Sequence, residues 1–197
     1  MKPTDILASA VVVTAVFSLS APVNAQQVLT GDTRLACEAV MCLAAGKRPD
    51  ECNPSLQKYF SINHRKFSDT LRARGDFLKL CPASNQTPQM QSLVSAIVNG
   101  AGRCDSGSLN ATLRTYTGDS RTSSYQVTIG NAMPDYCASY VGNELTRLDE
   151  VTPKYVGTPA RGGLWVKPAD YDVAMVAYNK RVAAEDVAAK NGFGGRN

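Results

Sequence analysis

The sequence has little of what metal and redox sites require. Its 197 residues include one histidine, His64, and no C-x-x-C pair. Structural zinc sites use short C-x₂₋₄-C pairs, usually two of them or one with histidines. Here 4, 9, 28, 22 and 32 residues separate the six cysteines, and a thioredoxin-like centre needs C-x-x-C. We therefore expect no metal and no redox-active dithiol.

The motifs of several enzyme classes are also absent. The chain has no G-x-S-x-G nucleophile elbow and no glycine-rich phosphate loop, and His64 lies in the basic run HRK. A wall-cleaving glycosidase needs an acid of raised pKa, often with a second carboxylate. Glu38 is the best candidate for that acid, but an ion pair with Arg34, one helical turn back, explains it equally well. We therefore assign no catalytic residue and no cofactor.

Long apolar runs are lacking beyond the N-terminus. There, Lys2 precedes the uncharged, mostly apolar stretch 6–19, which is followed by Pro22 and the small residues around Ala25. This is the pattern of a cleaved signal peptide, and the length of the stretch, 14 residues, falls short of the ~20 that span a bilayer. An uncleaved anchor is the alternative. We expect residues 1–25 to be removed after about Ala25 and residues 26–197 to be exported.

The cysteines are all in the mature part and are even in number, which favours three disulfides in an oxidising compartment. Cys37 and Cys42 share a predicted helix but point about 140° apart on it, so each needs another partner. The turn GKRPDEC favours Cys42–Cys52, which suggests Cys37–Cys81 and leaves Cys104–Cys137. Spacing alone does not decide among the 15 pairings.

Helix start and stop signals recur along the rest of the chain, so we expect a mainly α fold. Residues 26–150 form a small disulfide-stapled helical domain in this interpretation, and residues 151–197 a turn-rich connection, a C-terminal helix and a flexible tail. The first expected helix is 32–45, capped by Asp32 or Thr33 and stopped by a left-handed Gly46. The second begins at the cap Asn53 and Pro54, and the third contains Phe67 and Leu71 and stops near Gly75. The others are 88–100 after Thr87, one from Pro134 with an apolar stripe to Leu148, and 169–190.

Residues 105–131 differ from the rest because Gly, Ser, Thr and Asn are dense in them. Tyr125 to Ile129 is strand-like. A short β-hairpin turning at Gly118-Asp119 is one interpretation, and a mobile loop is the other.

Positive charge is concentrated in one stretch. Between Lys47 and Lys79 there are eight basic and four acidic residues, an excess equal to the net charge of +4. Such a face can meet anionic lipid heads, an acidic protein surface or nucleic acid, or it can simply be solvated. Aromatic residues do not alternate with the charges as a single-strand platform requires. We expect no nucleic-acid binding, whereas contact with a membrane surface stays open.

Several motifs carry a family resemblance. CEAVMCLAAGKRPDECNPSLQKYFSI, the later FLKLCP, the Tyr-Cys pair at 136–137 and YVGTP…GGLWV resemble the TrbM family (also called KikA) of plasmid conjugal transfer proteins, over about residues 30–166. The loop 105–131 and the last helix are not covered. The resemblance implies a periplasmic accessory of mating-pair formation in the type IV secretion system of a Gram-negative donor. It supplies no catalytic residues.

The cysteine cluster and this resemblance together suggest a docking site. Two disulfides near the GKRPDEC turn would fix its geometry, so the turn could dock other conjugation proteins of the cell envelope. The candidate residues are Lys47, Arg48, Asp50 and Glu51, with the aromatic pair Tyr59 and Phe60. The alternative for the turn is that it contacts only water. The alternatives for the function of the protein are a lytic-transglycosylase-like enzyme that acts on the cell wall and an exported inhibitor or exclusion factor. The oligomeric state is not predicted.

Overall fold

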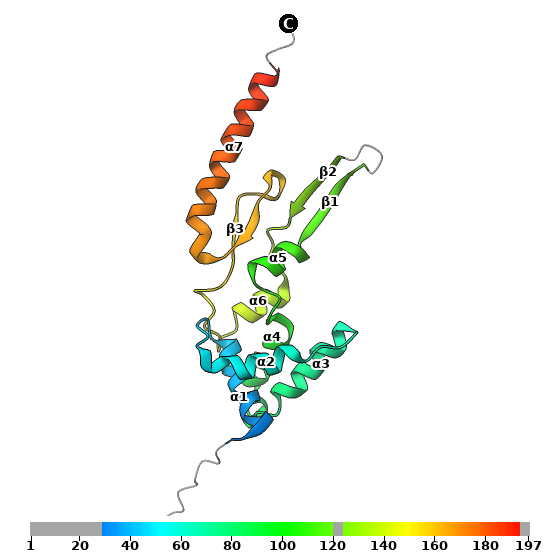
Figure 1. The fold of residues 1–197 in the computed structure, drawn as a ribbon, viewed down its shortest axis with the longest axis vertical. Coiled ribbons are helices and arrows are strands. Elements are labelled where there is room, and N and C mark those ends of the chain that lie inside the picture. The colour runs from blue at the N-terminus through cyan, green and yellow to red at the C-terminus, as the bar shows by residue number, and fades with distance from the viewer. Residues whose placement is uncertain (1–28, 120–123, 194–197) are drawn as a thin grey trace, which may run out of the picture.

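A computed structural model describes residues 29–119 and 124–193. The predicted signal peptide, residues 1–25, lies outside them. The described residues form seven α-helices, two antiparallel hairpins and short 3₁₀ turns (Figure 1), which confirms the mainly helical prediction. The elements are α1 (Gly31–Ala44), α2 (Asn53–Ser61), α3 (Phe67–Leu78), α4 (Pro88–Gly100), α5 (Ser106–Thr112), β1 (Arg114–Asp119), β2 (Ser124–Ile129), α6 (Asp135–Val141), β3 (Lys154–Val156), β4 (Leu164–Val166) and α7 (Tyr171–Phe193).

Helix α4 lies at the centre of the helical part and contacts α1, α3 and α6. Its predicted start is confirmed, because the Thr87 hydroxyl accepts a hydrogen bond from the Met90 N–H at 3.2 Å. Its apolar stripe is buried at Leu93, Val94 and Ile97. That stripe joins the buried face of α1, made of Ala36, Ala39, Val40 and Leu43, in one apolar core.

Three disulfides connect this helical part. They are Cys37–Cys81, Cys42–Cys52 and Cys104–Cys137. The first joins α1 to the segment after α3, the second closes the turn between α1 and α2, and the third joins the α4–α5 connection to α6. All three predicted pairings are therefore confirmed.

The ends of α1 differ from the prediction. Thr30, not Asp32 or Thr33, holds the N-cap position. At the other end the chain continues through Ala45 in an extended conformation, and Gly46 has no positive φ. A side chain at Gly46 would lie 2.7 Å from the Arg147 carbonyl oxygen. Glycine is needed there for close backbone packing, not for a left-handed turn.

Two further helix predictions are wrong at their boundaries. Asn53 does not cap α2, because a 3₁₀ turn over Asp50–Cys52 runs directly into that helix. Helix α3 continues past Gly75 to Leu78, and Gly75 is buried where α3 contacts α4. A Cβ at Gly75 would meet Val98 at 3.5 Å. At Gly75 the packing of α3 against α4 outweighs the local stop signal.

The segment 105–131 is partly helical and partly a hairpin. The Asp105 side chain caps α5, a helix that the sequence did not predict. The predicted hairpin is confirmed, but Gly118 and Asp119 belong to strand β1 and pair with Tyr125 and Ser124. Helix α6 ends at Val141, earlier than its apolar stripe suggested, and Leu148 is still buried beyond it.

The C-terminal part projects from the helical part (Figure 1). Strands β3 and β4 form a second hairpin that the sequence did not predict, and Trp165 on it is fixed by reciprocal contacts with Asn110 of 2.7 and 2.8 Å. The predicted last helix is confirmed as α7. No helix in the described ranges has the length and apolar character that crossing a membrane requires. The domain boundary at residue 150 stays a prediction.

Candidate functional site

The turn between α1 and α2 is held tightly at both ends. Cys42 near the end of α1 is bonded to Cys52. Cys52 is buried, and the Ser55 hydroxyl, also buried, donates a 2.9 Å hydrogen bond to its carbonyl. The four charged residues of the turn remain exposed: Lys47, Arg48, Asp50 and Glu51. The described structure therefore displays these charges from a covalently closed loop.

Donors from three segments satisfy the last carbonyls of α1. The Arg48 Nε donates to the Cys42 carbonyl at 3.3 Å. The Tyr140 hydroxyl donates to the Leu43 carbonyl, and the Arg147 N–H to the Ala44 carbonyl at 2.8 Å. These bonds replace the glycine cap that the sequence suggested. A guanidinium also suits the negative end of the helix dipole, so Arg48 has a structural role in addition to any docking role.

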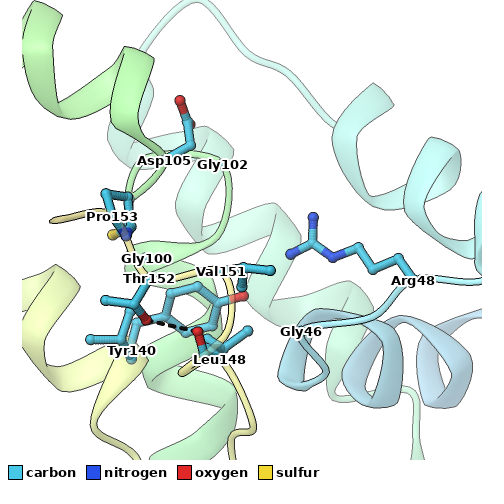
Figure 2. A pocket seen from close by; sticks show the side chains of 12 residues that line it. Gly46, Arg48, Gly100, Gly102, Asp105, Tyr140, Leu148, Val151, Thr152 and Pro153 are labelled. Carbon is cyan, nitrogen blue, oxygen red and sulfur yellow. Dashed lines mark hydrogen bonds between the residues drawn. The ribbon is translucent and has the colours of Figure 1, made fainter. Parts of the chain in front are cut away.

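A cavity of about 240 Å³ lies beside this turn (Figure 2). Its walls come from the turn, the α4–α5 connection, α6 and residues 148–153. Arg48 extends toward the cavity from one side, and Asp105 lies on another (Figure 2). The lining residues are Gly46, Arg48, Gly100, Gly102, Cys104, Asp105, Tyr140, Val141, Leu148, Val151, Thr152 and Pro153.

A second hollow of about 590 Å³ lies next to the cavity, and the two share Asp105, Val151 and Pro153 in their walls. The second hollow adds Glu150 and reaches Lys167 at the base of α7. We call the two neighbouring hollows the groove. Its walls carry the cations Arg48 and Lys167 and the carboxylates Asp105 and Glu150.

The two charged groups of the cavity wall, Asp105 and Arg48, have different environments. Burial raises the pKa of the Asp105 carboxyl, but hydrogen bonds from Ser108 and the Gly107 N–H outweigh it and hold that pKa below its ordinary value. Asp105 is therefore a charged cap of α5 with its acceptors in use. The Arg48 guanidinium forms no ion pair with a carboxylate among the residues that the structure describes, but it is close enough to the Tyr140 hydroxyl for a side-chain hydrogen bond that opposes the effect of burial on the pKa of that tyrosine. Arg48 is thus a cation of the cavity wall that can still pair with an anionic ligand.

Tyr140 forms the floor of the cavity. Burial raises the pKa of its hydroxyl, and the nearby Arg48 opposes that shift. The ring packs directly on Gly100, where an added Cβ would lie 2.4 Å from the Tyr140 Cβ. The cavity shape therefore depends on glycine at position 100 of α4.

The aromatic pair does not belong to this site. Tyr59 has no exposed surface and lies in the core, which corrects its assignment as a docking residue. Phe60 is partly exposed, but its ring lies against Gly102 and beneath the Arg74 guanidinium at 5.4 Å. Consecutive residues on a helix point about 100° apart. Because Tyr59 faces the core, Phe60 points away from it, but this direction does not bring Phe60 to the turn.

Glu38 has a structural environment. It forms an ion pair with Arg34 in the same helix, and one of its carboxyl oxygens is buried without a hydrogen-bond partner among the described residues. The pairing with Arg34 that the sequence suggested is therefore present. In the ranges 29–119 and 124–193 no cluster of three or more His, Cys, Asp or Glu side chains could hold a metal ion.

Sequence reasoning found the turn but missed the opposite wall. Tyr140, Val151, Thr152 and Pro153 lie about 100 residues further along the chain. No local signal places them beside Arg48, because the contact depends on the disulfides and on the packing of α6 against α4.

The family model TrbM matches residues 28–179. The chain belongs to the TrbM family. The match is longer than the stretch of sequence resemblance, and it includes residues 105–131 and the first part of α7. Searches of curated proteins and of solved structures found no match. The TrbM family indicates a conjugal transfer protein, and three disulfides are consistent with an exported protein of the cell envelope.

Proposed function

We propose that this TrbM protein is a non-enzymatic accessory of conjugal plasmid transfer that acts in the periplasm of a Gram-negative donor. It assists the assembly or stability of the mating-pair apparatus by docking another envelope protein of that apparatus. The docking site is the stapled turn with the groove beside it. An acidic side chain on an extended segment of the partner pairs with Arg48.

The observation that carries this proposal is the state of Arg48. Its Nε donates to the Cys42 carbonyl at the end of α1, which orients the guanidinium, and no carboxylate among the described residues pairs with it. A guanidinium that is already oriented loses little entropy when it forms a bidentate pair with a carboxylate. Lys47 beside it is highly exposed and has only a 3.7 Å contact with Glu150, so it can add to the attraction of an acidic segment.

The test is the transfer frequency from a donor that lacks this gene and carries it on a second plasmid. We expect transfer to fall without the gene and to return with the wild-type copy. A copy with Lys47→Glu and Arg48→Glu should restore transfer poorly, because it repels an acidic partner. Lys180→Glu with Lys190→Glu is the matched control, since it makes the same change of charge on exposed α7 residues and should restore transfer fully.

Two measurements keep the result interpretable. The amount of each variant in the periplasm, and its thermal unfolding in purified form, show whether Arg48→Glu only disturbs the end of α1. Lys47→Glu alone avoids that concern, because Lys47 is exposed and has no structural contact beyond Glu150. Normal transfer without the gene contradicts the assigned role, and full activity of the stable double variant contradicts the docking site.

A further inference from the structure

A second exposed surface lies at the other end of α2 from the stapled turn (Figure 1). It consists of His64, Arg65, Lys66 and Phe67, which we call the basic tip. All four residues are exposed, and the Phe67 side chain, the first residue of α3, is 51% exposed. A half-exposed aromatic ring therefore lies directly beside three consecutive basic residues.

The basic tip is held rigidly from behind. The His64 N–H donates a 2.8 Å hydrogen bond to the Thr70 hydroxyl, and Thr70 is almost fully buried. The Arg74 guanidinium donates to the carbonyl of Ile62 at 3.2 Å. Side chains of α3 therefore bind backbone groups of the α2–α3 connection, and the charged side chains of that connection remain exposed.

The charge of the whole chain is concentrated here. From Lys58 to Arg74 there are five basic residues and one acidic residue, Asp69. Asp69 pairs with Arg72 at 3.6 Å. Within the described residues neither Arg65 nor Lys66 forms an ion pair, so both cations of the tip are uncompensated.

An additional cation supports the phenylalanine. The Arg103 guanidinium lies 4.9 Å from the centre of the Phe67 ring and 3.8 Å from that of Tyr136. These contacts hold the Phe67 ring beside positive charge while leaving half of it exposed. The tip thus combines a fixed aromatic side chain with cations from two segments of the chain.

We propose that the basic tip binds the surface of an anionic lipid bilayer. Phe67 enters the headgroup region, where aromatic rings are favoured, and Arg65 and Lys66 contact lipid phosphates. Anionic surfaces attract juxtaposed Lys and Arg residues additively. A soluble acidic partner would be attracted by the same cations but gives no reason for an exposed Phe67. Association through this tip is peripheral and leaves the groove at the far end of α2 free.

The test is co-sedimentation of the oxidised mature chain with lipid vesicles. We expect binding to vesicles that contain phosphatidylglycerol, weakening with added salt, and little binding to phosphatidylcholine alone. Each cation near an anionic surface strengthens binding about fivefold, so Arg65→Gln with Lys66→Gln should weaken it by about 25-fold. Phe67→Ser should weaken it by about tenfold. Lys180→Gln with Lys190→Gln, the control, should not change it.

A variant that keeps an aromatic ring tests insertion directly. The chain has a single tryptophan, Trp165, which is buried, so Phe67→Trp adds one exposed reporter. Its fluorescence should shift to shorter wavelength with anionic vesicles only. Equal binding to phosphatidylcholine overturns the proposal. So does an unchanged spectrum, or binding that survives Phe67→Ser and is displaced by DNA or polyglutamate, because each of these indicates a general polyanion site.

Discussion

The stapled helices of residues 31–148 and the extension formed by β3, β4 and α7 are held together by different means. The helices carry all three disulfides and nearly all of the apolar core. The extension has no disulfide, and no side chain of α7 in the described range is fully buried. Contacts of Tyr178 with Thr158 and of Arg161 with Glu185 attach α7 to the β3–β4 segment, and the hydrogen bonds between Trp165 and Asn110 attach that segment to α5. Covalent closure therefore stabilises the part that carries the proposed docking site.

Among the changes that test this comparison, removing a disulfide should cause the largest loss of unfolding free energy. Cys37–Cys81 closes 44 residues and Cys42–Cys52 closes 10, so the chain-entropy model gives about 4 and about 2.7 kcal/mol. We expect Cys37→Ser with Cys81→Ser to lower the unfolding free energy more than the corresponding change at Cys42 and Cys52. Urea unfolding of both double variants measures the difference, and equal losses would contradict the loop-length explanation.

Two glycines make matched probes of the two regions. Gly100→Ala forces a Cβ into Tyr140 in the core and should cost about 2 kcal/mol of global stability. Gly157→Ala meets the Tyr178 ring at 2.2 Å and adds strain at a φ of +78°. Because Tyr178 attaches α7, the second change should release that helix locally.

Thermal unfolding and limited proteolysis separate these outcomes. Gly100→Ala should lower the melting temperature, and Gly157→Ala should leave it nearly unchanged while exposing the segment before α7 to protease. A large drop in melting temperature with Gly157→Ala would mean that the extension and the helices unfold as one unit.

The sequence predicted more of the stapled helices than of the extension. The pair Cys42–Cys52 was inferred because its cysteines flank the short GKRPDEC turn, and the other two pairs were inferred from it, although spacing alone does not decide among the 15 pairings. The β3–β4 hairpin was missed because its two strands have three residues each and depend on Asn110 of α5 to hold Trp165. The turn half of the proposed docking site was predicted from local charge. Its other wall was missed because residues 148–153 have no periodicity and reach Arg48 only through tertiary packing.

The pKa values of two tyrosines should be shifted in opposite directions. Burial raises the pKa of Tyr59 to about 12, although the Arg74 guanidinium opposes the shift. A hydrogen bond with Thr158 holds the pKa of Tyr178 below its ordinary value. Ultraviolet titration should lose its latest-ionising tyrosine in Tyr59→Phe, and an early-ionising one in Tyr178→Phe.

The shift at Tyr59 also predicts a pH dependence of stability. An unfolded tyrosine ionises near pH 10, so the unfolded chain releases this proton before the folded one does. The contribution is complete below pH 10 and is lost as the pH rises toward 12. Tyr59→Phe should reduce that alkaline loss, and an identical alkaline profile for the two proteins would contradict the assignment.

The smallest effect should follow removal of residues 183–197. The described side chains from 183 to 191 are exposed, and the ion pairs of Arg161 with Glu185 and Asp186 are solvated, so their loss should change the melting temperature very little. Thermal unfolding of the truncated chain measures this. A clear drop would show that the end of α7 supports the helices.

Site-directed photo-crosslinking in living donor cells tests the docking claim most directly. A crosslinking amino acid replaces Lys47 at the turn or, as the control, Lys190 on α7, in donors with and without the other conjugation genes. The account predicts one discrete adduct from position 47 that requires those genes and disappears with Arg48→Glu, and none from position 190. An adduct from position 190 alone, or one from position 47 that forms without the conjugation genes, would contradict it.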